Sequence, residues 1–255
     1  DTSGILNMTT GDLTITKSSD TSNSFLYNDG TFTANGRTVT LDNSGDTTTL
    51  LGSSSIAFAD LVITTGTTVD DLSDPGASAT GTFTNNGVYR RPQSVSGTGL
   101  FNFGLTGVTI YVSAKGDLTD ITVERIDEDH PNGTGVSGGD GTKTGKYWTI
   151  TPAPVSPTGF SVNITLPHNG LSDPSVCRYS GVAWDCARTS FNSSEVQRDS
   201  VTAFSDWTVG QHVGPTVVQL QSLSAGATSS VTSLGLLALT MLSVFVIGAA
   251  MKRRR

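Results

Sequence analysis

Three histidines, His130, His168 and His212, are the side chains whose chemistry best suits proton transfer near neutral pH. None of them lies in a G-x-S-x-G or comparable setting that would supply a nucleophile. The chain also contains no HExxH, CxxC, P-loop or dinucleotide-binding pattern. The sequence therefore predicts no catalytic residue and no cofactor. His130 and His168 adjoin prolines in predicted loops, so we interpret both as solvated loop residues.

Acidic residues gather beside a glycine-rich stretch at 133–142. Asp127 and Asp129 precede it and Asp140 lies within it. Calcium takes six to eight oxygen ligands, and a glycine-rich loop leaves carbonyl oxygens free to supply some of them. The spacing does not match an EF-hand loop. These three aspartates are calcium candidates, and a solvated hairpin loop is the simpler interpretation.

Two cysteines, Cys177 and Cys186, are nine residues apart. A hairpin that turns near 181–182 would place them directly opposite each other, with Tyr179 opposite Trp184 on the same face. Opposed Cβ atoms come within the spacing that a disulfide requires. The sequence predicts a disulfide here, with two free buried thiols as the alternative.

Aromatic side chains offer a second kind of site, because exposed rings can stack on sugars. The candidates are Tyr147, Trp148, Trp184 and Trp207. A tryptophan on a strand of a sandwich more often lies in the core. Glycan binding and core packing are both open for these residues.

Charge excludes one class of partner. The chain carries 15 Lys and Arg against 22 Asp and Glu, with four of the basic residues at 252–255. A nucleic-acid binder needs a basic footprint. The acidic body therefore argues against nucleic acid and fits a surface exposed to an outside medium.

The elements that would position these residues begin with a Thr-, Gly- and Asn-rich region at 1–88. Its segment 12–16 recurs at 60–64, and 30–36 recurs at 81–87, at shifts of about 50 residues. Short strand-like runs alternate with turn residues. A parallel β-solenoid is the first expectation, because such repeats need neighbours above and below. A pair of small antiparallel sheets is the alternative.

Residues 95–210 have a different texture, with all three tryptophans and both cysteines. In 160–166 apolar residues alternate with polar ones, which is typical of a strand with one face in a core. About seven short strands predict an Ig-like antiparallel β-sandwich. Residues 90–94 are interpreted as a junction, since Pro92 disfavours a central strand. The candidate strands are 100–104, 108–114, 118–126, 146–153, 160–167, the 176–187 hairpin and 201–210.

The last 25 residues carry the clearest signal. Residues 234–251 contain no charge, and an 18-residue helix would be about 27 Å long, close to the roughly 30 Å hydrocarbon core of a bilayer. A buried core helix is the alternative. The positive-inside rule places the basic end in the cytoplasm and everything before it outside. The anchor residues are Leu234, Leu237, Phe245, Ile247, Lys252, Arg253, Arg254 and Arg255.

Four segments resemble parts of bacterial cell-surface proteins. Residues 30–64, GTFTANGRTVTLDNSGDTTTLLGSSSIAFADLVIT, resemble the coils of large filamentous, adhesin-like proteins. The segments 146–152 and 201–210 resemble β-sandwich modules that precede C-terminal anchors in such proteins. The tail at 234–255 is similar to sorting signals read by exosortase- or rhombosortase-type enzymes. Those signals need a short recognition motif, and 225–230 contains neither LPxTG nor Pro-Glu-Pro.

Together these features predict an all-β chain with one C-terminal transmembrane helix. The expected parts are repeats at 1–88, a sandwich at 95–210, a spacer at 211–230, the helix at 231–251 and a cytoplasmic tail at 252–255. The chain begins at Asp1 without an export signal, so we expect a processed product or a fragment of a longer polypeptide. We expect a non-enzymatic surface stalk. Its expected partners are membrane lipid, an extracellular glycan or protein ligand, and a sorting protease acting before residue 234, with simple membrane retention equally compatible.

Overall fold

The structure is a computed structural model that describes residues 5–16, 23–133, 145–168 and 170–211. Within these ranges every extended element is a β-strand, and the one helical element is a short 3-10 turn, η1 (Gly104–Thr106). The prediction of an all-β chain is confirmed. The described residues belong to one compact unit that ends at Val213, and the unit at 214–255 lies outside them.

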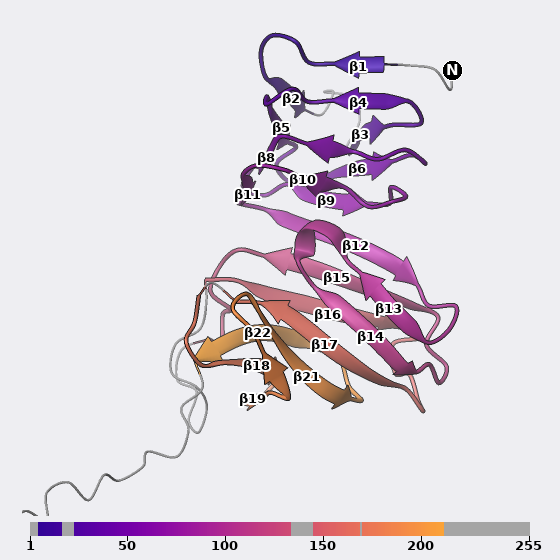
Figure 1. Ribbon diagram of the computed structural model, residues 1–255, viewed down its shortest axis with the longest axis vertical. Coiled ribbons are helices and arrows are strands. Elements are labelled where there is room, and N and C mark those ends of the chain that lie inside the picture. The colour runs from indigo at the N-terminus through magenta and orange to yellow at the C-terminus, as the bar shows by residue number, and fades with distance from the viewer. Residues whose placement is uncertain (1–4, 17–22, 134–144, 169, 212–255) are drawn as a thin grey trace, which may run out of the picture. The chain divides into compact units, whose positions relative to one another are not determined.

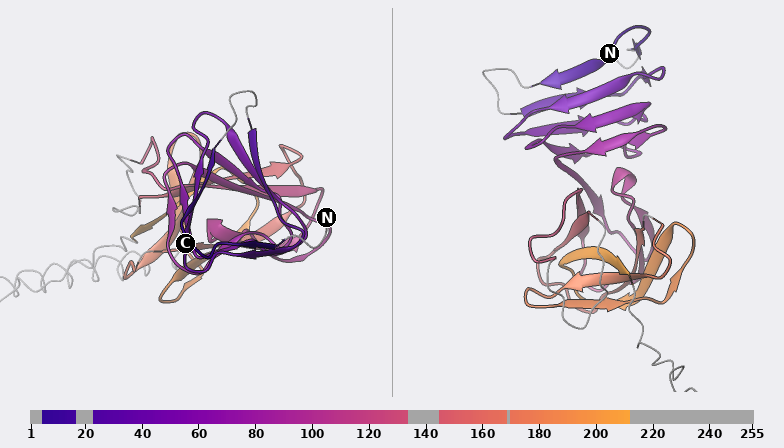
Figure 2. Two further views of the ribbon diagram at one scale, coloured as in Figure 1. Left: turned by 90° about the horizontal axis from the view of Figure 1, so that it is seen from above. Right: turned by 90° about the vertical axis from the view of Figure 1, so that its left-hand side faces the viewer.

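Twelve strands form the N-terminal part, in four successive coils of three strands each. They are β1 (Ile5–Asn7), β2 (Leu13–Thr16) and β3 (Asn23–Tyr27); β4 (Thr31–Thr33), β5 (Thr38–Asp42) and β6 (Thr47–Leu51); β7 (Ala57–Phe58), β8 (Asp60–Ile63) and β9 (Thr68–Asp71); β10 (Ser78–Ala79), β11 (Phe83–Asn85) and β12 (Val88–Ser94). Strands β2, β5, β8 and β11 pair in parallel along one side, and β3, β6, β9 and β12 along another. The third side holds β1 with β4 and β7 with β10. The result is a parallel β-solenoid, whose three-sided outline is visible from above (Figures 1 and 2).

Alternation along each strand builds the solenoid core. In β5 the side chains of Val39 and Leu41 are fully buried, while Thr38 and Thr40, which alternate with them, are only partly covered. The same pattern recurs in β8 at Leu61 and Ile63. Because successive side chains point to opposite faces, each coil contributes a layer of apolar residues and presents threonine outward. This stacking confirms the predicted solenoid over the antiparallel alternative.

The internal repeat has a different basis from the one the sequence indicates. Leu13 pairs with Val39, and Val39 pairs with Leu61, so the 48-residue shift spans two coils. The second match joins 30–36 to 81–87, yet β4 and β11 lie on different sides of the solenoid. The prediction of one duplicated unit of about 50 residues is therefore wrong. The physical repeat is a single coil, whose side-chain pattern is too loose to be visible by letter identity.

Ten further strands form the C-terminal part of the described unit. They are β13 (Gly99–Asn102), β14 (Thr109–Ala114), β15 (Asp120–Ile126), β16 (Tyr147–Ala153), β17 (Ser161–Pro167), β18 (Pro174–Tyr179), β19 (Trp184–Ala187), β20 (Ser190–Phe191), β21 (Glu195–Val201) and β22 (Asp206–Gln211). Strands β13, β14, β17, β21 and β20 form one antiparallel sheet. Strands β15, β16, β22, β18 and β19 extend from β12 as the other. The two sheets share one apolar core and so make a sandwich-like pair.

The core of this sandwich contains the residues that the alternation predicts. Val162, Ile164 and Leu166 in β17 are fully buried. Trp148 and Trp207 are also fully buried and directly opposed on β16 and β22. Trp184 is 8% exposed. The three tryptophans are therefore packing residues, which confirms the core interpretation.

Strand β12 connects the two parts, where the sequence indicates a junction without a strand. It pairs in parallel with β9 through Val88–Arg90 and antiparallel with β15 through Val88–Ser94. A nine-stranded sheet thus runs without a break from the coils into the sandwich. Pro92 is tolerated because the pairing to β9 ends at Arg90, so from there β12 has a strand neighbour on one side alone.

Two further differences concern the end of the sandwich. The sequence places one strand at 201–210, whereas β21 ends at Val201 and β22 begins at Asp206. Strands β20 and most of β21 are missing from the predicted set, because 190–200 is polar and lacks alternation.

The predicted membrane segment lies outside the described residues. So does the predicted spacer at 211–230, apart from residue 211. This applies to Leu234, Leu237, Phe245 and Ile247 and to the tail Lys252, Arg253, Arg254 and Arg255. Among the residues that are described, no helix has the length and apolar character to cross a bilayer.

Candidate functional site

A buried carboxylate lies where the last two coils meet. Asp71, at the end of β9, is fully buried, and its Oδ2 accepts a hydrogen bond of 2.8 Å from the backbone N–H of Ala77. The Tyr89 hydroxyl donates to the same oxygen, and the Ser73 hydroxyl donates to Oδ1. Burial and the neighbouring Asp71 charge raise the pKa of Tyr89 well above its usual value. The phenol therefore stays protonated as a donor to Asp71.

Arg91 provides the cation that matches this carboxylate. Its Nη1 lies 3.0 Å from Asp71 Oδ2 and also donates to the carbonyl oxygens of Asp71 and Ser73. The Arg91 side chain is 9% exposed. Gly76 covers the guanidinium, since a Cβ built at Gly76 would lie 2.3 Å from Arg91 Cζ. The ion pair is thus enclosed, which is the geometry in which removing one partner is most costly.

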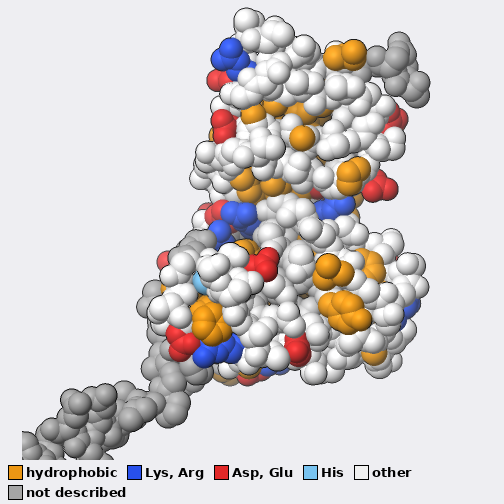
Figure 3. Space-filling view, viewed as in Figure 1, with side chains coloured by type: hydrophobic (Ala, Val, Ile, Leu, Met, Phe, Trp, Pro, Cys, Tyr) orange, Lys and Arg blue, Asp and Glu red, His pale blue; other side chains and the backbone are white. Residues whose placement is uncertain are grey.

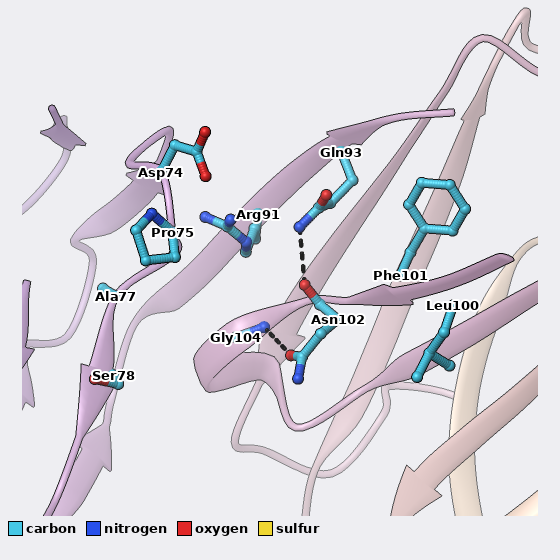
Figure 4. Close-up of a pocket in the computed structure, with 11 residues that line it drawn as sticks. Asp74, Pro75, Ala77, Ser78, Arg91, Gln93, Leu100, Phe101, Asn102 and Gly104 are labelled. Carbon is cyan, nitrogen blue, oxygen red and sulfur yellow. Dashed lines mark hydrogen bonds between the residues drawn. The ribbon is translucent and has the colours of Figure 1, made fainter. Parts of the chain in front are cut away.

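A pocket of about 610 Å³ opens beside this ion pair (Figure 4). In the view of Figure 4, Arg91 lies between Pro75 and Gln93, and Asn102 approaches from the strand that also carries Leu100. Gln93 Nε2 donates to the Asn102 carbonyl at 2.8 Å, which joins β12 to β13. On the face drawn in Figure 3, basic side chains lie along the boundary between coils and sandwich.

The chemistry available in this pocket is limited. Arg91 is already neutralised by Asp71, and the Gln93 amide is engaged by backbone. No histidine, cysteine or nucleophile–base pair lines it. We interpret it as part of a joint between coils and sandwich. Arg90 strengthens the same joint through a two-point pair with Asp70 on β9 and a contact of 3.4 Å to Glu124 on β15.

A second cluster lies on the outer face of the sandwich, around His130. Directly opposed residues form a row across four strands: Thr149, Asp206, Tyr179 and Trp184. The His130 ring packs over this row, with ring centroids 5.1 Å from Tyr179 and 5.0 Å from Trp184. His130 Nε2 lies 3.1 Å from Asp206 Oδ2. Contrary to the prediction of a solvated loop residue, His130 is 9% exposed.

The hydrogen bonds of His130 define its tautomer and its role. The backbone N–H of Asn132 donates to Nδ1 at 3.0 Å, so Nε2 carries the proton that faces Asp206. Trp184 Nε1 donates to the Asn132 carbonyl at 2.9 Å, which fastens the same loop to β19. The cluster fastens the loop at 130–133 to the sheet.

The other histidine interpretation is also wrong. His168 is 6% exposed, and its Nε2 lies 2.9 Å from the Asn192 carbonyl oxygen. This contact spans 24 residues, so the local sequence around His168 does not reveal it. His212 lies outside the described residues.

The predicted hairpin is present, and its two strands pair in the predicted register. Cys177 is opposite Cys186, and Tyr179 is opposite Trp184. The two sulfur atoms are bonded, 2.13 Å apart. The turn lies at 180–183, where the Ser180 backbone N–H donates to the Ala183 carbonyl at 2.9 Å.

The calcium candidates are only partly described. Asp127 accepts two hydrogen bonds of 2.7 Å from Arg125, so its carboxylate is already paired. Asp129 is exposed, and Asp140 lies outside the described residues. Within the described ranges, no three acidic, histidine or cysteine side chains gather as metal ligands would. Calcium binding at 127–140 stays a prediction.

A third site, beside Arg178, was not indicated by the sequence. An open pocket of about 560 Å³ lies where β22 begins, between β16 and the turn after β18. Its lining includes Arg178, Asp206 and Phe204. It lies beside 202–205, the segment between β21 and β22 that belongs to no strand, and no local sequence pattern predicts it.

Comparison with known proteins found no matching family model, no matching curated protein and no matching solved structure.

Proposed function

We propose that this chain is a non-enzymatic surface protein, a membrane-anchored stalk whose coils display upstream modules and contribute to adhesion. The observation that carries the proposal is the nine-stranded sheet that passes through β12. Strand pairing and the buried Asp71–Arg91 pair both cross the joint between coils and sandwich. Such a joint suits a part that must hold its two ends in a fixed relation.

The free end of the solenoid supports the display of further modules. Within the described chain, β1, β2 and β3 each pair on one side only. Their sequences ILN, LTIT and NSFLY contain no charge and no proline. Natural sheets protect exposed edges with charges, prolines or short strands, because an unpaired edge recruits other strands. An edge without charge or proline suits another β-coil stacked on it.

The anchor is the remaining part of the proposal. Residues 231–251 cross the membrane, Lys252 to Arg255 stay in the cytoplasm, and the sandwich is Ig-like and extracellular. Membrane lipid is the direct partner. A sorting protease that acts before residue 234 would replace this anchor, and the mass of the mature chain distinguishes cleavage from retention.

Cell-surface labelling tests the proposal. An epitope tag fused before Asp1 should be accessible to antibody on intact cells, and deletion of residues 231–255 should release the tagged chain into the medium. The matched control replaces the four basic residues at 252–255 by glutamine. This change should weaken the preference for a cytoplasmic C-terminus and leave the apolar segment intact. A tag that is inaccessible on intact cells, or a deleted chain that stays with the membrane fraction, would overturn the proposal.

The second candidate function is a glycan- or matrix-binding module. The burial of Trp148, Trp184 and Trp207 removes these rings as stacking platforms. What favours binding instead is the pocket beside Arg178, whose cation has no acidic partner among the described residues. A polysaccharide-cleaving enzyme is the least favoured class, and degradation of any polysaccharide by the purified chain would reverse that order.

A further inference from the structure

The pocket beside Arg178 results from the way β22 enters the sheet. Strand β22 pairs with β16 at Trp148 and Thr149 and with β18 along its length, and it begins at Asp206. Residues 202–205 belong to no strand, although Ser205 is still joined to β16, because the Ile150 backbone N–H donates to its carbonyl at 2.9 Å. The pocket opens beside this segment, between 150–152 on β16 and 178–181 at the end of β18. Its volume of about 560 Å³ lies within the range of roughly 300–1,000 Å³ that is typical of small-molecule sites.

Arg178 is the unusual residue in this pocket. Its Nε is buried and has no hydrogen-bond partner. No carboxylate of the described residues lies within ion-pair distance of its guanidinium, in contrast to Arg188 and Arg198, which pair with Asp173 and Asp185. The residue as a whole is only partly buried, so its charge is open to the pocket that it lines. An anion in the pocket would give the guanidinium the ionic partner that it lacks.

The other lining side chains restrict the kind of anion. The same space is lined by Thr149, Thr151, Ser205, Pro152 and Phe204. The Thr149 and Ser205 hydroxyls already donate to Asp206, so each offers a ligand its acceptor lone pairs. Phe204 is held flat against Phe160, with ring centroids 5.0 Å apart and planes at 10°. Hydroxyl groups and a fixed ring suit a sugar, which offers both hydroxyls and a C–H face. A single guanidinium matches the planar carboxylate of a monoanion.

We propose that this pocket binds a sugar acid, a uronate residue whose carboxylate pairs with Arg178. The ligand hydroxyls hydrogen-bond to the threonine and serine side chains, and one sugar face lies against Phe204. The site belongs to the binding-module function and stands independently of the stalk, because none of its lining residues takes part in the joint at β12.

Asp206 is the charged group that most affects this assignment, because it lines the same pocket. Both of its oxygens already accept hydrogen bonds, Oδ1 from Thr149 at 2.7 Å and Oδ2 facing His130 at 3.1 Å. Asp206 is opposite Tyr179 in the sheet, whereas Arg178 is opposite Trp207, so the two side chains leave opposite faces of the sheet. The carboxylate of the ligand would bind at the Arg178 end and its hydroxyls toward Asp206.

Titration calorimetry of the full chain in detergent with D-galacturonate tests the proposal. Galacturonate should bind, and its methyl ester should bind at least about ten-fold more weakly, because a hydrogen bond to a charged group is worth roughly that factor. Acetate keeps the carboxylate but lacks the sugar ring and its hydroxyls, so it too should bind more weakly than galacturonate. Arg178→Met should abolish the difference between galacturonate and the ester. Arg178→Lys should retain part of it, since lysine keeps the charge and loses the two-point geometry. Lys115→Met removes the same charge outside the pocket and should leave affinity unchanged.

Several results would overturn the assignment. Equal binding of acetate and galacturonate would mean a site for carboxylates in general, and equal binding of galacturonate and its ester would remove the role of Arg178. Absence of galacturonate binding overturns it outright. Denaturation without ligand provides the check on folding: an unpaired cation adds no stability, so Arg178→Met should unfold at the same urea concentration as the wild type or a higher one. A clear decrease would make Arg178 structural. None of these results bears on the stalk function, which is tested separately by release of the chain from cells.

Discussion

Arg91 on β12 and Asp71 on β9 form an ion pair, with Nη1 3.0 Å from Oδ2, inside the joint between the coils and the sandwich. Asp71 is fully buried and the Arg91 side chain is 9% exposed. The carboxylate also accepts hydrogen bonds from Ala77 and Tyr89, and the guanidinium donates to two carbonyl oxygens. Because the pair is enclosed and well hydrogen-bonded, each partner depends on the other.

Substitution of Arg91 by methionine should therefore destabilise the chain by about 3–5 kcal/mol, since it leaves the Asp71 charge buried without a cation. Urea denaturation followed by tryptophan fluorescence measures the change. Arg90→Met is the matched control, because the Arg90 side chain is 35% exposed and its pair with Asp70 should contribute no more than about 1 kcal/mol. Equal losses in the two variants would contradict the role assigned to burial.

The stability of the chain should decrease as pH rises above about 10. Burial and Asp71 raise the pKa of Tyr89 well above its usual value of 10.0, so the unfolded chain loses its phenol proton at a lower pH than the folded one. The stabilising contribution is thus complete below pH 10 and is lost as pH rises toward the folded-state pKa. Comparing the unfolding free energy of wild type and Tyr89→Phe between pH 8 and 11 isolates the contribution of the Tyr89 phenol. The phenylalanine variant should be less stable at pH 8 and should show the shallower decline.

Gly76 should tolerate no side chain, because a Cβ at this position would lie 2.3 Å from Arg91 Cζ and 2.5 Å from Nη1. Arg91 is held by Asp71 and cannot move aside without breaking the ion pair. Gly76→Ala is expected to destabilise by roughly 1–3 kcal/mol, the usual effect of overpacking. Gly97→Ala is the control, since nothing lies within 4 Å of the position that its methyl group would take. If thermal unfolding shows Gly76→Ala to be as stable as the wild type, the guanidinium has room to shift.

The hairpin at 176–187 and the strand at 160–166 could be predicted because their information is local. Opposed positions in a hairpin follow from the turn, so Cys177 with Cys186 and Tyr179 with Trp184 follow together. Alternation of Val162, Ile164 and Leu166 specifies the face of a strand within seven residues. In both places the local pattern and the tertiary packing agree.

The joint and the His130 cluster could not be predicted, because they depend on register between distant segments. Asp71 and Arg91 are 20 residues apart and meet only because one coil of that length brings β9 beside β12. His130 meets Asp206 across 76 residues. Pro92 also led to a wrong prediction for 90–94, because β12 tolerates a proline only beyond the point where its pairing to β9 ends.

The disulfide between Cys177 and Cys186 should stabilise the end of the sandwich by a moderate amount. The two residues close a loop with a sequence separation of nine, and a loop of that length corresponds to about 2–3 kcal/mol in the chain-entropy account. The double variant Cys177→Ala/Cys186→Ala should therefore lower the unfolding free energy by that amount, measured in urea without reductant. Reductant should bring the wild type to the level of the variant and leave the variant unchanged. Because the His130 ring packs on Tyr179 and Trp184 of the same hairpin, near-ultraviolet circular dichroism should report looser aromatic packing in the double variant. Unchanged stability would mean that the ladder between β18 and β19 and the His130 cluster hold the hairpin closed without the covalent link.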